Sequence, residues 1–336
     1  MLPSPSIASK TSRRGILLAA GGLLVPHTLL PGAALAQQTP SALGVTVDYS
    51  ARDYEIVDYR FYEDPSLPGV KLRGPRFDPA AAEDFFTCIG AAQTLGVFVE
   101  RPYPTLLSER LSLPAWNVGL GGANARFFLD HPRIIELANR GRFVILQVMA
   151  ARSEHNDRIS PTAGAELVRD EKRGDVVVTN TAWDRIKTEE PANLQRYISQ
   201  SRAAWRDNYR RLLDRLTVPV LLFWFSPKPM DAPIDTAASS GFGLLDRFPQ
   251  FVEGTDIEAV RPMAEGFAAC LSDRNTGHPL ISRFTGKPVQ IGSMRTEKRF
   301  LSHGEASRNI YYPSPEMHED AADLLEASVA KLTPSR

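Results

Sequence analysis

Short apolar runs alternate with longer stretches of helical periodicity through the middle of the chain. The apolar runs are compact and typical of buried strands, and they lie at residues 85–90, 114–118, 142–150 and 218–225. Between them, the spacing predicts helices over residues 93–110, 123–140 and 194–216. Strands that alternate with helices are joined by right-handed crossovers, so the pattern predicts an α/β fold with a doubly wound, mainly parallel sheet.

The third predicted helix has the clearest pattern. Its apolar residues form one stripe at helical spacing: Leu194, Tyr197, Ile198, Trp205, Tyr209, Leu212, Leu213 and Leu216. The arginines at 202, 206, 210 and 211 lie off this stripe. We interpret them as a solvated surface rather than as a phosphate-binding face.

Less regular segments flank and interrupt this core. Alternating aromatic residues at 49–62 predict an edge strand or hairpin before the main domain. The polar stretches 151–190 and 226–255 have the length of lids, site walls or small subdomains. Near the end of the chain, the pattern predicts a strand at 287–291 and a helix at 316–331.

The first 36 residues resemble a twin-arginine export signal. Arg13 and Arg14 precede an apolar, Gly/Ala-rich stretch, and the motif 34–36 (Ala-Leu-Ala) suits cleavage after Ala36. Glycines and prolines interrupt the stretch, so we expect no stable membrane insertion after cleavage. The expected organisation is a signal peptide at 1–36, a linker and hairpin at 37–83, and an α/β domain at 84–336 of a periplasmic protein.

Composition and residue spacing argue against several classes of ligand and partner. Lysine plus arginine and aspartate plus glutamate each number 39, so no net field favours nucleic acid. No CxxC, HxH or HExxH spacing supports a zinc site, and we expect no cofactor. An oxidising compartment would permit a bridge between Cys88 and Cys270, although the apolar surroundings of Cys88 favour a buried thiol.

Polar or glycine-rich segments follow the predicted strands, where doubly wound sheets bind their ligands. They are residues 90–94, 117–124 and 152–156, joined by 314–320 at the start of the last helix. We therefore expect a small-molecule or glycan ligand at this edge of the sheet.

The order of these segments resembles the SGNH (GDSL-like) hydrolase superfamily, whose sheet is flavodoxin-like, over most of residues 84–333. Gly90 and Thr94 match its first motif, but the position of the serine nucleophile holds Ala92. A methyl group cannot attack a carbonyl. In its second motif, Asn117-x-Gly119-x-x-Gly122 matches well. The resemblance implies that the backbone of Gly122, and that of Gly90, serves an oxyanion hole.

The last motif of the superfamily is also incomplete here. His318 matches the general base, whereas Pro315 replaces the aspartate that would orient it. Glu316 is a candidate replacement for that acid. Thr94 and Ser153 are candidate displaced nucleophiles, although a helix brace for Thr94 and a loop anchor for Ser153 are the commoner uses of such hydroxyls.

A closer resemblance is to a bacterial family of no established activity. The matching segments include Gly90-Ala91-Ala92-Gln93-Thr94, Arg152-Ser153 and Tyr312-Pro313-Ser314-Pro315-Glu316-Met317-His318. This resemblance supports the fold and leaves the reaction open.

Further polar residues at these junctions are candidates for binding a substrate. Arg152 directly follows a buried strand and is the best candidate for an anionic or carboxylate group, with the anchoring of the next loop as its alternative role. The other candidates are Gln93, Asn117, Asn124 and Asn156.

Three functions remain open from the sequence. The first is an exported protein that acts on, or binds, an acylated glycan or related ester as a divergent hydrolase or acyltransferase. The second is a binding protein that kept the cleft and lost the chemistry, as Ala92 and Pro315 suggest. The third reads residues 119–124 as a nucleotide loop, a weak signal because Asn124 stands where the final glycine of GxGxxG belongs.

Overall fold

The computed structural model describes the α/β part of the chain. The described residues are 46, 49, 53–234, 236, 244–245, 247–289, 301–302 and 307–332, and all of them belong to the compact unit Pro40–Arg336. The unit Met1–Thr39, and with it the predicted export signal, lies outside them. Among the helices described, none has the length and apolar character needed to cross a membrane.

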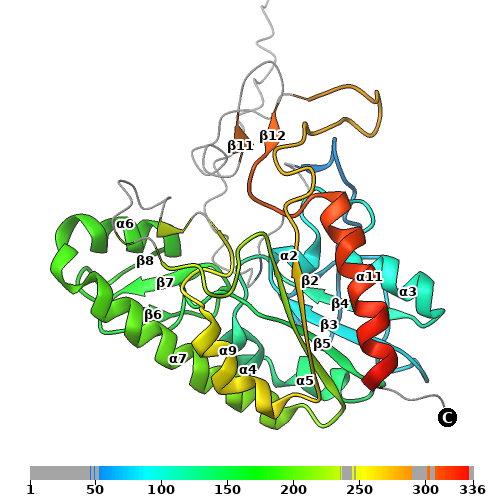
Figure 1. Ribbon diagram of the computed structural model, residues 1–336, viewed down its shortest axis with the longest axis horizontal. Helices are drawn as coiled ribbons and strands as arrows, with labels where there is room; N and C mark the ends of the chain where they lie inside the picture. Colours follow the sequence, from blue (N-terminus) through cyan, green and yellow to red (C-terminus); the bar gives the residue numbers. More distant parts are fainter. Residues whose placement is uncertain are drawn as a thin grey trace, which may run out of the picture. The chain divides into compact units, whose positions relative to one another are not determined.

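A five-stranded sheet forms the centre of this unit (Figure 1). In spatial order its strands are β10 (Gly266–Leu271), β9 (Val220–Ser226), β5 (Val144–Gln147), β3 (Phe86–Gly90) and β4 (Ala115–Gly119). Every neighbouring pair is parallel. Numbered along the chain this is the order 2-1-3-4-5 of flavodoxin-like sheets. The predicted fold class is therefore confirmed.

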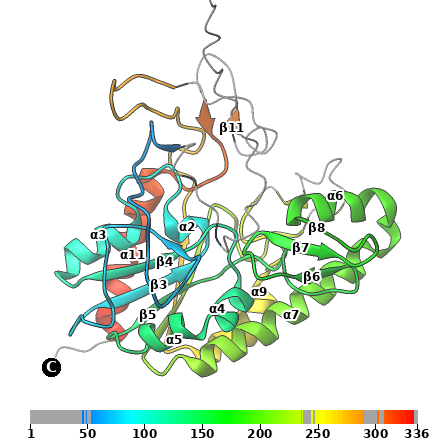
Figure 2. The ribbon, with the colours of Figure 1, turned by 180° about the vertical axis from the view of Figure 1, so that it is seen from behind.

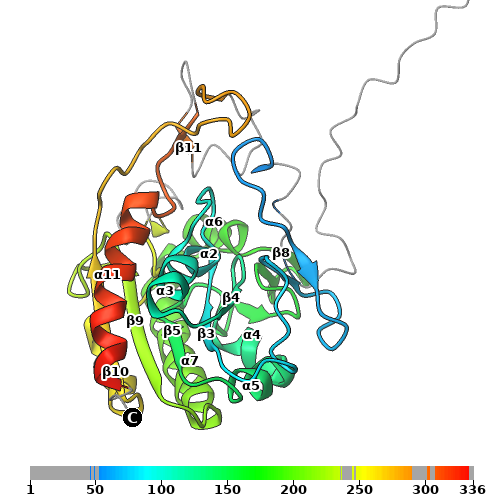
Figure 3. The ribbon, with the colours of Figure 1, turned by 90° about the vertical axis from the view of Figure 1, so that its right-hand side faces the viewer.

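Helices cover both faces of the sheet, because strand residues alternate between two apolar clusters. Along β9, for example, Leu222 and Trp224 point to one face, and Phe223 and Phe225 to the other. Figure 3 shows the two layers of helices. One layer is α3 (Tyr103–Leu111) and α11 (Pro315–Leu332); the other is α4 (Ala125–Asp130), α5 (Pro132–Ala138), α7 (Leu194–Arg215) and α9 (Gly254–Val260).

Helix α7 confirms the predicted stripe and fixes the chain after β5. Trp205 Nε1 donates to the Met149 carbonyl at 2.8 Å, and the Tyr209 hydroxyl accepts from Met149 N at 2.6 Å. Two of the four arginines predicted to form a solvated surface have a buried partner instead: Arg202 and Arg206 pair with Asp256 of α9. Arg210 makes only an exposed pair with Asp207, and Arg211 is exposed. Arg202 and Arg206 thus hold a neighbouring helix.

The polar stretch after β5 forms a small insertion with its own sheet (Figures 1 and 2). It contains three antiparallel strands and a helix: β6 (Ile159–Pro161), β7 (Leu167–Asp170), β8 (Asp175–Val178) and α6 (Thr179–Glu189). A 3₁₀ turn, η1 (Pro191–Asn193), leads into α7. Arg158 is almost fully buried and pairs with Asp170, Glu189 and Glu190, which ties the sheet to the helix end.

Two of the predicted helices are broken in the structure. Residues 93–110 form α2 (Ala92–Leu95) and α3, separated by a turn in which Gly96 has φ +79°. Buried Arg73 donates to the carbonyls of four residues of this turn, Leu95, Gly96, Val99 and Glu100. Burial lowers the pKa of Arg73 to about 10. Residues 123–140 divide into α4 and α5 at Pro132, which opens the second helix.

The remaining elements are short. The N-terminal hairpin pairs β1 (Tyr62–Glu63) with β2 (Lys71–Leu72), later in the chain than the alternating pattern predicted. The described part of the predicted strand 287–291 ends at residue 289 and forms only an isolated bridge, Ile281 to Pro288. Before α11, β11 (Leu301–Ser302) pairs with β12 (Arg308–Asn309), and η2 (Arg261–Met263) precedes β10.

The two cysteines are buried and free. Cys88 lies on β3 and Cys270 on β10, with β5 and β9 between them. Three strand spacings correspond to about 14 Å, well beyond the reach of a disulfide. The bridge that an oxidising compartment would permit is therefore ruled out by the sheet order.

Candidate functional site

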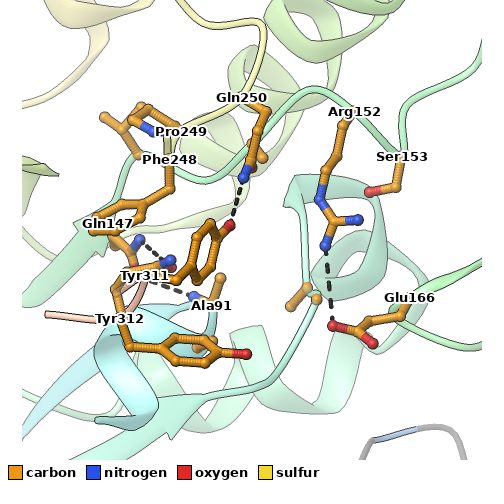
Figure 4. Close-up of a pocket in the computed structure, with 16 residues that line it drawn as sticks. Ala91, Gln147, Arg152, Ser153, Glu166, Phe248, Pro249, Gln250, Tyr311 and Tyr312 are labelled. Carbon is orange, nitrogen blue, oxygen red and sulfur yellow. Dashed lines mark hydrogen bonds and ion pairs between the residues drawn. The ribbon is translucent and has the colours of Figure 1, made fainter. Parts of the chain in front are cut away.

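A pocket opens at the carboxyl ends of the strands (Figure 4). It lies beside the neighbouring strands β3 and β5, from which the chain continues in opposite directions along the sheet, to β4 and to β9. The hollow encloses about 490 Å³, including its open mouth. Its lining comes from the connections that follow all five strands of the central sheet: Ala91, Ala92, Gln93, Gly122, Ala123, Gln147, Val148, Ala150, Arg152, Ser153, Glu166, Phe248, Pro249, Gln250, Tyr311 and Tyr312.

The floor of the pocket is a buried amide network around Gln147 at the end of β5. Its Oε1 accepts from Ala91 N at 3.0 Å and from Thr94 Oγ1 at 2.6 Å, and its Nε2 donates to Gln93 Oε1 at 3.1 Å. A Cβ on Gly90 would lie 2.1 Å from Thr94 Oγ1 and 2.5 Å from Gln147 Oε1. Gly90 is therefore needed for close approach, and it lies beneath the floor rather than in the lining.

One wall of the pocket carries two opposite charges. Arg152 NH1 donates to Asn180 Oδ1 at 2.9 Å, and Arg152 NH2 lies 3.9 Å from Glu166 Oε1 (Figure 4). The Arg152 carbonyl accepts from Trp183 Nε1 at 2.7 Å. Helix α6 of the insertion supplies both Asn180 and Trp183, so the insertion holds Arg152 against the pocket.

Gly122 gives Glu166 its place in this wall. Gly122 has φ +76°, and a Cβ there would lie 1.8 Å from Glu166 Cγ. Both the backbone conformation and the packing therefore require glycine. Among the described residues, its N–H has no partner. An oxyanion-hole role for Gly122 stays a prediction.

The opposite wall is aromatic. Figure 4 shows Phe248, Tyr311 and Tyr312 facing Arg152 and Glu166 across the hollow. Gln250 Nε2 donates to the Tyr311 hydroxyl, and Tyr311 packs edge-on against both Phe248 and Tyr312. Aromatic rings opposite polar side chains are suited to a ligand with one apolar and one polar face.

Ser153 lines the pocket, where its hydroxyl oxygen acts as a hydrogen-bond acceptor. Its Oγ accepts from Asn124 Nδ2 at 3.2 Å, and Asn124 Oδ1 in turn caps α4 by accepting from Phe127 N at 2.9 Å. No histidine or carboxylate of the described residues hydrogen-bonds to Ser153. A nucleophilic role for it stays a prediction without an observed base.

His318 is fully buried on α11 and does not line the pocket. Its Nδ1 accepts from Tyr103 N at 3.1 Å, and its ring stacks on Tyr103 and meets the edge of Phe225. Its Nε2 has no partner among the described residues. Burial, with a smaller effect of the Arg73 charge, lowers the pKa of His318 to about 3. The ring is therefore neutral throughout the physiological range.

The other candidates from the sequence lie outside the lining. Thr94 is buried and braces Gln147, and Asn117 donates to the Thr94 carbonyl at 3.1 Å. Asn156 holds the turn before β6 by accepting from Arg158 N and Ile159 N. Glu316 Oε1 accepts from Asn275 Nδ2 at 2.8 Å and makes no contact with His318. The structure thus brings only Gln93, Gly122, Arg152 and Ser153 to the pocket.

Sequence reasoning missed most of the polar lining. Gln147 had a visible signal, because it is an amide inside the apolar run 142–150. Glu166 and Gln250 stand in polar stretches without a motif, and Tyr311 lies just ahead of the matched segment that starts at Tyr312. Nothing in their spacing pointed to one pocket.

Within the described ranges, no arrangement of side chains supports a metal site or a nucleotide-binding loop. No group of three or more His, Cys, Asp and Glu residues there could hold a metal ion. In the glycine-rich segment, Asn124 caps α4 and the carboxylate side chain of Glu166 packs on Gly122. A carboxylate at that position repels a phosphate, which argues against the nucleotide-loop reading.

Comparison with known proteins gives fold-level similarity. Residues 50–159 match the family described as a Domain of unknown function (DUF6473). No curated protein matches the chain. Among solved structures, it is similar to phospholipase A1 from Streptomyces albidoflavus NA297, with 12% identity and a TM-score of 0.39 over 74% of this chain and 100% of the other.

Two further structures give similar values. An acetyl xylan esterase, AlAXEase, has 13% identity and a TM-score of 0.34 over 72% of this chain and 98% of the other. A protein assigned to the G-D-S-L lipolytic family from Desulfitobacterium hafniense DCB-2 has 15% identity and a TM-score of 0.30 over 72% and 99%.

Proposed function

We propose that this chain is a binding protein whose pocket takes a small carboxylate-bearing ligand of the acylated-glycan type, without serine–histidine chemistry. The observation that carries this proposal is the arrangement of Arg152. Its guanidinium is anchored at the pocket wall by Asn180. Among the described residues, the other side-chain N–H groups of Arg152 have no hydrogen-bond partner, and the nearest carboxylate is that of Glu166 at 3.9 Å. An anchored guanidinium with open donors is suited to a carboxylate.

The same geometry argues against the ester-cleaving reading of the superfamily resemblance. At the position that the resemblance gives to the nucleophile, Ala92 lines the pocket with a methyl group. The residue that the resemblance gives to the base, His318, is buried outside the lining, with Nδ1 occupied by the Tyr103 N–H. A serine esterase needs both groups within hydrogen-bond reach.

The aromatic wall supports a sugar as the body of the ligand. Phe248, Tyr311 and Tyr312 offer ring faces and hydroxyl groups, and Gln93, Gln147 and Gln250 offer amides. A pyranose ring presents apolar C–H faces and equatorial hydroxyls that match such a lining. The exported, periplasmic location predicted from residues 1–36 is part of this proposal.

A matched pair of sugars tests the proposal. N-acetylmuramate carries a lactyl carboxylate that N-acetylglucosamine lacks. In calorimetric titrations, we expect N-acetylmuramate to bind the wild-type chain, and Arg152→Gln to weaken this binding by about ten- to hundredfold, the usual effect of a lost hydrogen bond to a charged group. Arg169→Gln is the matched control, because Arg169 is exposed on β7 and, within the described ranges, its side chain hydrogen-bonds to the Gly174 carbonyl alone.

Besides the failure of any carboxylated sugar to bind, two results would contradict the proposal. One is that N-acetylmuramate and N-acetylglucosamine bind the wild-type protein equally well and that Arg152→Gln binds both as the wild type does. The other is hydrolysis of p-nitrophenyl acetate by the wild-type protein that is lost in His318→Ala or Ser153→Ala, since this result would support a divergent hydrolase or acyltransferase.

A further inference from the structure

We propose that the ligand of this pocket carries an ammonium group beside its carboxylate, and that Glu166 binds the ammonium. This inference rests on the proposed function, because it adds a second charged group to the ligand that Arg152 would hold. It defines the ligand class as a zwitterion, such as an amino sugar acid.

Arg152 and Glu166 lie side by side, but they make no hydrogen bond to each other. Their closest charged atoms are 3.9 Å apart, beyond hydrogen-bond distance, and their side chains keep 13% and 29% exposure. Among the described residues, no group donates a hydrogen bond to the Glu166 carboxylate. Both charges therefore keep open positions at the pocket.

The carboxylate of Glu166 is held in place and is not a loosely placed surface group. The Glu166 carbonyl accepts from Thr179 N at 3.0 Å and from Thr179 Oγ1 at 2.9 Å. Its side chain packs on the bare Cα of Gly122, where a Cβ would lie 1.8 Å from Glu166 Cγ. The position of the negative charge is therefore built into both the insertion and the loop after β4.

Electrostatics then favours a zwitterion over a simple anion. A carboxylate bound to Arg152 also approaches Glu166, and this like-charge contact weakens its binding. An ammonium group on the same ligand turns the repulsion into attraction. A hydroxyl group of the ligand can donate one hydrogen bond to Glu166, but it carries no positive charge to offset the negative charge of the carboxylate.

A purely structural role explains the pair less well. An ion pair at 3.9 Å without a hydrogen bond contributes little to stability. The loop that bears Arg152 is already anchored, through Asn180 and through Trp183 Nε1. Glu166 is thus not needed to hold Arg152.

Three sugars separate the two charges of the ligand. Muramate has both an ammonium and a carboxylate, N-acetylmuramate has only the carboxylate, and glucosamine has only the ammonium. By calorimetric titration at pH 7, we expect muramate to bind the wild-type chain about tenfold or more tightly than either of the others. Glu166→Gln should remove the preference for muramate over N-acetylmuramate, and it should leave N-acetylmuramate bound at least as well as before.

Controls separate charge from size and from folding. Glu171→Gln, at an exposed position of the same insertion, should keep the preference. Thermal unfolding should show that Glu166→Gln remains folded. A preference for muramate that persists in Glu166→Gln overturns the inference, because it would reflect only the size of the acetyl group. So does equal or tighter binding of N-acetylmuramate by the wild-type chain.

The failure of this inference can be told from the failure of the proposed function. If N-acetylmuramate binds through Arg152 and muramate gains nothing, the ligand is a carboxylate but not a zwitterion. If neither carboxylated sugar binds, the proposed function falls together with this inference.

Discussion

At the scale of single residues, the pocket and the buried histidine belong to different environments. Ala92 lines the hollow, whereas His318 of α11 packs between Tyr103 and Phe225. A neutral imidazole whose acceptor nitrogen is bonded to a backbone N–H has no lone pair left to take a proton from a nucleophile. The buried His318, like the methyl group of Ala92, therefore fits the proposed binding role.

Restoring the serine tests this reading. We expect Ala92→Ser to leave hydrolysis of p-nitrophenyl acetate at the level of the wild-type chain, because no histidine is among the described residues that line the pocket. The double variant Ala92→Ser with His318→Ala is the control. A clear gain in Ala92→Ser that the double variant loses would show that His318 reaches the pocket.

A second residue, Glu154, predicts a pH dependence of stability. It is fully buried beside Ser153, and its Oε2 accepts from Asn208 Nδ2 at 2.7 Å. Its Oε1 has no hydrogen-bond partner in the described part of the chain. Burial raises its pKa from 4.5 to about 8, although Asn208 and the charge of Arg126 act in the opposite direction. Between these values the folded state keeps a proton that the unfolded chain has lost, so stability falls as pH rises through this window.

The variant Glu154→Gln should remove this pH dependence. Its unfolding midpoint should be close to that of the wild-type chain below pH 4.5, and the gain over wild type should grow until about pH 8. Differential scanning calorimetry at several pH values measures this gain. Glu171→Gln, at an exposed site, should show none. A constant offset at all pH values would mean that Glu154 does not titrate in this window.

At the scale of elements, the site depends on how the insertion packs on the loop after β4. Gly122 and Gly174 both have positive φ, at +76° and +71°. A Cβ on Gly122 meets Glu166, whereas one on Gly174 meets nothing within 4 Å. The two positions therefore separate backbone strain from steric collision.

Substitution by alanine exploits this difference. Gly174→Ala should cost about 1–2 kcal/mol of unfolding free energy, from strain alone. Gly122→Ala should cost more, and it should also weaken the binding of muramate, because Glu166 must move. Chemical denaturation measures the first effect and calorimetric titration the second. Equal costs for the two variants would show that Glu166 does not hold its position against Gly122.

The buried charges of the insertion give a separate prediction. Asp170 is fully buried and pairs with Arg158 and Arg185. Because Asp170→Asn leaves Arg158 buried without its closest counter-charge, it should destabilise the fold by about 3–5 kcal/mol, measured by chemical denaturation. Asp157→Asn affects an exposed pair with Arg196 and an exposed hydrogen bond from Gln200, and it should cost at most about 1 kcal/mol. Similar small losses in both variants would contradict the idea that this cluster ties the insertion together.

At the scale of the whole chain, the alternation of strands and helices was enough to predict the sheet and the edge at which its pocket lies. That pattern is local, since each buried strand shows its own apolar run. The breaks at Gly96 and Pro132 were harder to predict, because Arg73 shapes the turn after α2 from outside the periodic segment.

The site was predicted only in part, and for a physical reason. Arg152, Ser153, Gly122 and Gln93 stand at strand ends, where position alone suggests a ligand. Glu166, Gln250 and Tyr311 reach the pocket through the insertion and through long connections, whose paths no periodicity encodes. The motif resemblance selected His318, but packing placed its ring in the apolar core.

In the proposed complex, Arg152 binds a ligand carboxylate in the hollow between the charged and the aromatic wall. A crystal structure of the chain with N-acetylmuramate tests it most directly. We predict the lactyl carboxylate within hydrogen-bond distance of the Arg152 guanidinium and the sugar ring against Tyr311 or Tyr312. A ligand bound elsewhere, or one whose acetyl carbonyl points at Ala92 while Arg152 contacts only protein, would contradict the account.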